Sequence, residues 1–186
     1  MRLLANAFDR EPFADWFVRR DARRAERFLR FFDVHWRLAM PHGEVYTAQE
    51  RQGTALWIPP GRWKANLWDE LLYLPDMLWM TGIRALLAKA DAVHLAEQHH
   101  PTGPHYYSLA LGTLPEFRRQ GIGSALMQPI LSRCDASKLP AYLETTSEPN
   151  VLFYEHHGFQ VREIFQLPRD GPKAWLMWRE PVQKSG

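Results

Sequence analysis

The chain has 186 residues, of which 46% are hydrophobic and 24% charged, and its formal net charge is +2. These values are ordinary for a soluble globular protein, and the length fits a single domain over residues 1–186. The small net charge argues against a nucleic-acid-binding surface. The one cysteine, Cys134, excludes an intramolecular disulfide. Together with the lack of a secretory or membrane-spanning pattern, it leads us to expect a cytoplasmic protein.

The first forty residues predict helices. Residues 1–8 already have a helical pattern, and from 21 to 40 apolar residues recur at three- and four-residue spacing, which is typical of an amphipathic helix. The other side of this second helix carries five arginines, which we interpret as facing solvent rather than binding an anion. They are Arg23, Arg24, Arg27, Arg30 and Arg37.

A hairpin and further helices follow. Residues 44–49 and 53–58 predict two short strands joined by a polar turn. Residues 62–98 predict helical segments, broken near Pro75 and Gly82, that would cover one face of a sheet.

The second half of the chain predicts the rest of the sheet. A strand over 106–111 leads through a glycine turn into a helix whose apolar stripe ends at Cys134, which we therefore interpret as a core residue. A strand over 141–145 comes next, and the order strand, helix, strand predicts two parallel strands. A short helix through His156 and a hairpin of residues 159–167 and 173–179 complete a mixed sheet.

The glycine turn Arg118-x-x-Gly121-x-Gly123 connects an apolar strand to a helix. Glycines at such a turn let backbone N–H groups approach an anion, and the helix N-terminus adds a partial positive charge. A P-loop is excluded because Gly-Lys-Ser/Thr does not follow, and a dinucleotide-binding fold is disfavoured because no Gly-x-Gly-x-x-Gly lies near the start. The turn predicts a pyrophosphate site.

Two further motifs accompany this turn: Leu143-Glu144-Thr145 on the next strand, and Asn150-x-x-Phe153-Tyr154-Glu155-x-x-Gly158-Phe159. In combination they resemble the GNAT superfamily of N-acetyltransferases, and residues 106–181 most resemble its puromycin N-acetyltransferase-like members. The resemblance implies an α/β fold with a mixed, splayed central sheet flanked by helices, and acetyl-CoA as co-substrate. The family's first strand has no counterpart in this sequence, which leaves two interpretations: a bare sheet edge or a truncated start. A bare edge would need covering or a partner, so a monomer and a homodimer both stay open.

The resemblance also implies which residues bind acetyl-CoA. Backbone N–H groups of the turn would hold the pyrophosphate, and Arg118 and Arg119 would add positive charge. Backbone groups of the preceding strand would pair with the pantetheine arm, much as an added strand does. The turn residues are Arg119, Gln120, Gly121, Ile122, Gly123 and Ser124, and the strand residues are Leu111, Gly112 and Thr113.

Two catalytic residues are implied in the same way. Tyr154 would donate a proton to the departing thiolate, which suits a phenol because its ordinary pKa is near 10 and it is protonated at neutral pH. Glu144 would either accept the proton of the acceptor amine or bind its ammonium group. We expect Asn150 to cap the helix that carries Tyr154, and the family also implies a contact with the cofactor arm.

The acceptor side is less defined. The clustered histidines do not form a ligand pattern, so we expect no metal, although His35 and His105 could face the acceptor. Tryptophans between Trp57 and Trp79 suggest an aromatic-lined pocket. The predicted function is acetyl transfer from acetyl-CoA directly to a primary amine of a small molecule, with neither nucleic acid nor membrane as partner. A protein or peptide amine, or a non-catalytic acyl-CoA sensor, remain alternatives.

Overall fold

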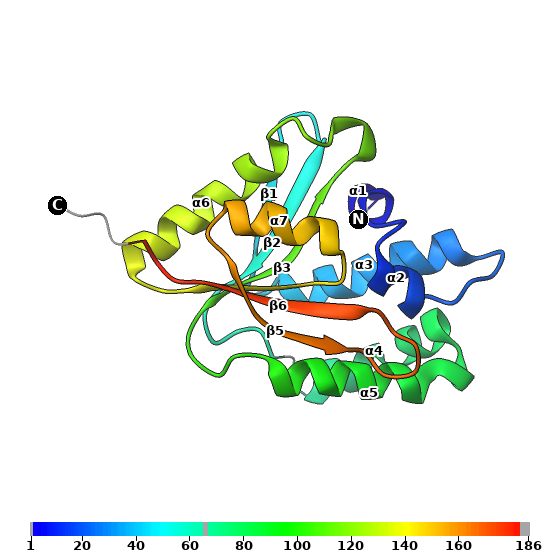
Figure 1. Cartoon of the computed structure of the whole chain (residues 1–186). Helices are drawn as coiled ribbons and strands as arrows, with labels where there is room; N and C mark the ends of the chain where they lie inside the picture. The colour runs from blue at the N-terminus through cyan, green and yellow to red at the C-terminus, as the bar shows by residue number, and fades with distance from the viewer. Residues whose placement is uncertain (1, 65–66, 183–186) are drawn as a thin grey trace.

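The computed structural model describes residues 2–64 and 67–182 and has the expected α/β architecture. Its strands are β1 (Glu44–Thr47), β2 (Gly53–Ile58), β3 (Tyr106–Thr113), β4 (Ala141–Thr145), β5 (Gln160–Gln166) and β6 (Lys173–Arg179). They form one six-stranded mixed sheet in the order β1-β2-β3-β4-β6-β5 (Figure 1). The parallel pair is β3 and β4, as the strand-helix-strand order predicts.

Helices cover both faces of the sheet. They are α1 (Arg2–Ala7), α2 (Pro12–Phe17), α3 (Arg24–Ala39), α4 (Leu67–Thr81), α5 (Ile83–His99), α6 (Ile122–Ser137) and α7 (Glu148–His156). Residues of α1 to α4 pack against one face, and α6 and α7 pack against the other, while α5 lies along α4 (Figure 1). We call these the α1–α5 layer and the α6–α7 layer. Within the described residues, no helix is long and apolar enough to cross a membrane.

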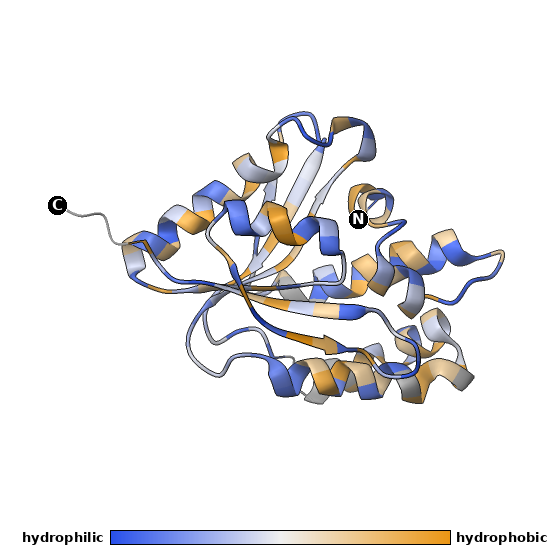
Figure 2. Cartoon of the chain, in the orientation of Figure 1, coloured by the Kyte–Doolittle hydropathy of each residue, from blue (hydrophilic) through white to orange (hydrophobic). Residues whose placement is uncertain are grey.

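The inner strand β2 contributes side chains to the cores of both layers. Leu56 and Ile58 join the core of the α1–α5 layer, and Ala55 and Trp57 join the core of the α6–α7 layer, because successive side chains of a strand point to opposite faces. Cys134 of α6 is fully buried in the second core, as predicted, and burial raises the pKa of its thiol to about 12. Figure 2 shows the alternation of hydrophobic and hydrophilic segments along α3 and α6 that this two-sided packing requires.

Two predictions about helices are wrong. Pro75 lies inside α4 without ending it, whereas the break at Gly82 is confirmed, with a φ of 80° immediately before α5. Ser147, not Asn150, is the N-cap of α7, which begins at Glu148. Pro149 explains the earlier start, since proline is favoured in the first turn of a helix, where its missing N–H would be unpaired anyway.

The arginines of α3 are paired rather than merely solvated. Arg27 is 7% exposed and binds Asp21 through bonds of 3.1 and 2.9 Å, and Arg30 binds Asp76 at 2.8 and 2.9 Å. The first pair holds the turn before α3 and the second joins α3 to α4. The solvent-facing interpretation is therefore wrong for Arg27, because its charge is neutralised inside the layer.

The sheet opens between β3 and β4. These strands pair only over residues 106–108 and 141–143, and β4 then continues beside β6 while β3 continues beside β2. The register of β2 with β3 shifts between Leu56 and Trp57, so Leu109 is an extra residue opposite β2. Such a bulge bends its strand and increases the local twist. The result is a V-shaped opening between residues 109–113 and 144–145, which confirms the splayed sheet.

Candidate active site

The N-terminus of α6 stands at the end of β3, on one side of this opening. Gly121 is its N-cap in the left-handed region, with φ 79° and ψ −3°, and Arg119 is also left-handed, with φ 61°. Helical bonding starts with the N–H of Ala125 donating to Gly121, at 3.0 Å. The N–H groups of the three preceding residues lack an intrahelical acceptor, and neither a capping side chain nor an acidic first-turn residue competes for them. This geometry fits an anion.

The two arginines of the turn differ in what they contact. The Arg118 guanidinium donates to the carbonyl oxygen of Ala7 at 2.8 Å, and its Nε lies 3.5 Å from that of Thr113, so it fastens α1 to the end of β3. Arg119 is exposed, and no ion pair of its guanidinium is found within the described residues. Arg119 therefore leaves a positive charge at the turn, whereas Arg118 is engaged with backbone.

Two glycines of the predicted cofactor site allow close packing. A Cβ on Gly112 would lie 2.9 Å from side-chain atoms of Ala7 and Phe8, so this glycine lets α1 lie directly on β3. A Cβ on Gly123 would lie 3.2 Å from the ring of Phe153, so this glycine lets α6 approach α7. Both glycines therefore set how closely neighbouring elements approach each other around the opening.

Tyr154 lies on α7 in the α6–α7 layer and is 8% exposed. Its ring packs against Phe153 and Phe159, with centroid separations of 5.2 and 6.0 Å. Burial raises the pKa of the Tyr154 phenol, and the negative charge of Glu11 raises it further. The phenol therefore stays protonated at neutral pH, and no hydrogen bond of its hydroxyl is found among the residues described.

Glu11 is a site residue that the sequence did not reveal. The Asn150 amide donates to its carboxylate at 3.1 Å, and the N–H of Phe13 donates to Thr146 Oγ1, also at 3.1 Å. Burial raises the pKa of Glu11, while the Asn150 hydrogen bond and the Arg118 charge lower it. The segment between α1 and α2 is thereby held beside β4, α7 and the glycine turn. Glu11 and Asn150 lie 139 positions apart, so no local pattern could have joined them.

Glu144 lies on β4, where the strands part, with its side chain 26% exposed. Its Oε1 accepts a hydrogen bond of 2.8 Å from the Tyr142 hydroxyl. Residues two apart on a strand share a face, so Glu144 lies with Tyr142 on the face of the α1–α5 layer. The predicted catalytic pair thus flanks the opening, with the carboxylate on one face of the sheet and Tyr154 on the other.

Of the remaining acceptor-side predictions, those for His35 and Trp57 disagree with the structure, whereas His105 lies near Glu144. The His35 ring packs at a tilt against that of Phe31 within α3, and burial lowers its pKa, so it is engaged in helix packing rather than in an acceptor site. Trp57 is likewise buried in the opposite layer, so the aromatic-pocket interpretation is wrong for it. His105 lies beside Tyr142, near Glu144. Over residues 2–64 and 67–182, no group of three or more His, Cys, Asp or Glu side chains is placed to hold a metal.

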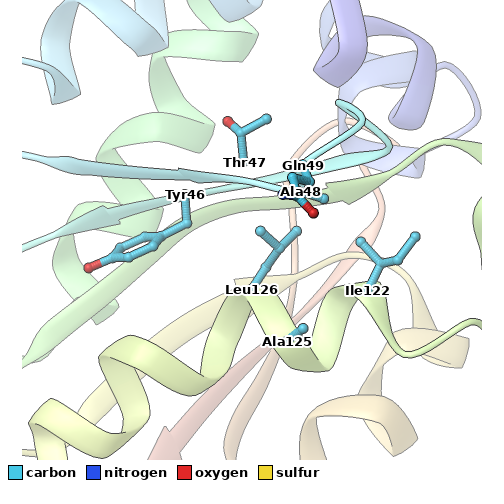
Figure 3. A pocket seen from close by; sticks show the side chains of 7 residues that line it. All are labelled: Tyr46, Thr47, Ala48, Gln49, Ile122, Ala125 and Leu126. Atoms are coloured by element: carbon cyan, nitrogen blue, oxygen red, sulfur yellow. The ribbon is translucent and has the colours of Figure 1, made fainter.

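A separate cavity of about 330 Å³ lies between β1 and the first turns of α6 (Figure 3). It is distinct from the opening of the sheet, because Ile122 and Leu126 face it whereas Gly123 faces Phe153 of α7. Its lining is mainly apolar and contains neither a catalytic candidate nor a charge. The lining residues are Tyr46, Thr47, Ala48, Gln49, Ile122, Ala125 and Leu126.

Comparison with known proteins agrees with this geometry. Residues 84–161 match the acetyltransferase (GNAT) domain family. An uncharacterized N-acetyltransferase of Schizosaccharomyces pombe is 29% identical over 158 residues, which are 77% of this chain; the chain spans 62% of that relative's length.

Solved structures share the fold. A Corynebacterium glutamicum protein described as histone acetyltransferase HPA2 and related acetyltransferase superposes with a TM-score of 0.72 at 22% identity, over 99% of this chain and 90% of that one. The C-terminal condensation domain of Ebony superposes with a TM-score of 0.58 at 14% identity, over 96% and 90%. The described chain therefore shares the fold of these structures, and its segment 84–161 is similar to the GNAT acetyltransferase domain family.

Proposed function

We propose that this chain is an N-acetyltransferase that moves the acetyl group of acetyl-CoA directly to a primary amine of a small molecule. The observation that carries the proposal is the V-shaped opening, with an uncapped helix N-terminus at its rim and a protonated phenol and a carboxylate on its two faces. Both helical layers build their cores on the same sheet, which supports one acetyltransferase domain over the described chain.

The donor site follows from the turn between β3 and α6. The N–H groups of Ile122, Gly123 and Ser124 would bind the pyrophosphate, together with the charge of Arg119 and the left-handed turn at Gly121. Within the described residues, no strand pairs with the side of residues 111–113 that faces the opening, so the pantetheine amides can pair there. We assign Asn150 a place beside the pantetheine arm, because its amide binds Glu11 of the segment that lies beside β4 and the glycine turn.

The chemistry needs three events: the ammonium loses a proton, the amine attacks the thioester carbonyl, and the thiolate is protonated as the C–S bond breaks. Glu144 takes the first proton. Tyr154 gives its proton to the thiolate and is reprotonated by the second proton that leaves the nitrogen. Protons balance, with one released to solvent for each amide formed, and no acetyl-enzyme intermediate is required.

The acceptor is an amine that reaches Glu144 from the face of the α1–α5 layer. The resemblance to puromycin N-acetyltransferase-like proteins concerns residues 106–181, which build the cofactor side, and fold and cofactor motif persist while acceptor pockets change. The acceptor is therefore defined as a chemical class, a small primary amine, rather than as one compound.

Thiol release from acetyl-CoA, measured over a panel of amines, tests the proposal. The panel contains small primary amines, puromycin among them, and peptides with a free N-terminus or a lysine. We expect release with at least one small amine, matched mole for mole by its N-acetylated product, and no acetyl group left on the protein. Turnover of peptides alone would reassign the acceptor, and binding of acetyl-CoA without any turnover would indicate a sensor.

A further inference from the structure

Two buried histidines lie behind Glu144. His100 follows α5 and His105 precedes β3, and they are 6% and 3% exposed. The His100 ring stacks on Trp63, with centroids 3.7 Å apart, and meets Tyr107 and Tyr142 edge-on at 5.0 and 4.8 Å. Neither histidine has a part in the chemistry described above.

Their hydrogen bonds fix where the ring protons lie. His105 Nδ1 is 2.7 Å from the carbonyl oxygen of Gly103, which can only accept, so this nitrogen carries the proton. In the neutral ring, His105 Nε2 is then an acceptor, and His100 Nε2, 3.0 Å away, must donate to it. The neutral His100 ring therefore has its lone pair on Nδ1. That nitrogen faces Glu144 Oε1 at 3.7 Å.

We propose that His100 is the proton acceptor of Glu144, so that the proton of the acceptor amine passes from Glu144 to His100 Nδ1. The inference rests on the proposed function and extends it by one residue, with His105 as a positioning residue that sets the tautomer of His100.

Protons and charges balance in this step. The ammonium gives a proton to Glu144, the protonated carboxyl gives it to His100 Nδ1, and Glu144 becomes a carboxylate again beside an imidazolium. The gap of 3.7 Å must close to about 2.8 Å for transfer, and catalytic hydrogen bonds commonly tighten only when substrate is bound. His100 then returns its proton to solvent, which completes the release of one proton per turnover.

The groups around His100 are neutral apart from the Glu144 carboxylate. The described titratable groups that face it are Tyr107, Tyr142, His105 and Glu144. Burial and the Glu144 charge raise the pKa of both tyrosines, which stay neutral. Burial lowers the pKa of His105, against the Gly103 hydrogen bond, so His105 also stays neutral. Among these described groups, Glu144 is then the charged one, and its charge is negative.

The pH dependence of turnover tests the proposed proton transfer from Glu144 to His100. For His100→Gln we expect kcat/KM for the amine at pH 7 to fall about tenfold or more, with KM for acetyl-CoA unchanged. The deficit should shrink as the pH approaches the pKa of the amine, because free base then arrives without needing a proton acceptor. The matched control is His99→Gln, since His99 is the preceding residue but binds Glu163 at 2.9 Å. It should keep parental turnover at every pH.

A loss for His100→Gln that is the same at every pH would assign the pair a merely structural role and overturn the inference. Nitrogen-15 NMR of the histidine rings in the parent gives a second readout that needs neither turnover nor a folded variant. We expect the proton on Nδ1 in His105 and on Nε2 in His100. A proton on Nδ1 of neutral His100 would overturn the inference. With the expected tautomers but no turnover of any amine, the proposed function fails and takes the proton transfer to His100 with it. Turnover with a pH-independent deficit in His100→Gln overturns the proton transfer alone.

Discussion

Tyr154 is the residue on which the proposed chemistry depends most directly. Because its phenol is buried beside the negative charge of Glu11, its raised pKa keeps the proton in place until a thiolate appears. Replacing the hydroxyl leaves the packing against Phe153 and Phe159 intact, since the ring remains. The effect of its removal should therefore be confined to catalysis.

We expect Tyr154→Phe to lower kcat about 100-fold or more while KM for acetyl-CoA stays within about twofold. Thermal unfolding should be unchanged, because no hydrogen bond of the hydroxyl is found within the described residues. Steady-state kinetics with the best amine of the panel provides the measurement. Tyr106→Phe is the control, because Tyr106 packs against the same core from β3. Equal kcat for Tyr154→Phe and the parent would remove Tyr154 from the mechanism.

At the scale of single residues, the sequence predicts candidate residues that belong to a short motif. Tyr154 and Glu144 could be named as candidates because each lies in a short motif on one element. Glu11 and His100 could not, since their partners Asn150 and Glu144 are far away in the chain and are brought to them by α1–α2 packing and by the loop after α5. The same limit explains the error at Asn150, whose amide binds Glu11 instead of capping α7.

The first turn of α6 is the element that carries the proposed pyrophosphate site. The proposed anion site depends on Gly121, whose left-handed conformation leaves the following N–H groups free of the turn. A Cβ at Gly121 would meet no atom within 4 Å, so a substitution there perturbs the backbone without a clash. Gly123 is less informative, because a side chain would strike Phe153.

We expect Gly121→Ala to weaken acetyl-CoA binding about fivefold or more, because a non-glycine residue disfavours the left-handed region by about 1 kcal/mol or more and the turn relaxes. Calorimetry with CoA gives the affinity. The matched control is Gly61→Ala, since Gly61 has a φ of 74° and equally open surroundings in the turn after β2. Both variants should lose similar stability, and only the first should lose affinity. Unchanged affinity in Gly121→Ala would refute the proposed pyrophosphate site at this turn.

Elements with a clear hydrophobic period could be predicted closely. The strands β2, β4 and β6 begin and end where the sequence predicts, because each is bounded by turn residues and buried on its packed faces. The helix break at Pro75 was wrong because α4 lies against α3 and α5, and this packing outweighs one missing backbone hydrogen bond. The bulge at Leu109 leaves no signal in the sequence, yet it lies where the sheet opens.

At the scale of the whole molecule, buried polar contacts as well as the apolar core hold the helices of the α1–α5 layer together. Lys89 of α5 is 5% exposed and donates to the carbonyl oxygen of Trp16, at the end of α2, at 2.6 Å. Its Nζ also lies 3.0 Å from the centroid of the Trp16 ring. Burial lowers the pKa of this lysine from 10.5 to about 8. A protonated Lys89 is therefore a charge buried in the folded layer.

Because of this charge, the free energy of unfolding should depend on pH. Between pH 8 and 10.5 the folded state holds fewer protons at Lys89 than the unfolded state, so rising pH favours folding, and below pH 8 the contribution is constant. We expect the free energy of unfolding of the parent, minus that of Lys89→Met, to rise by about 1 to 3 kcal/mol from pH 8 to 10.5. Urea unfolding across this range measures it, with exposed Lys173→Met as control, for which the difference should stay flat. A flat difference for Lys89→Met as well would mean that the Trp16 ring and carbonyl fully offset the cost of burial.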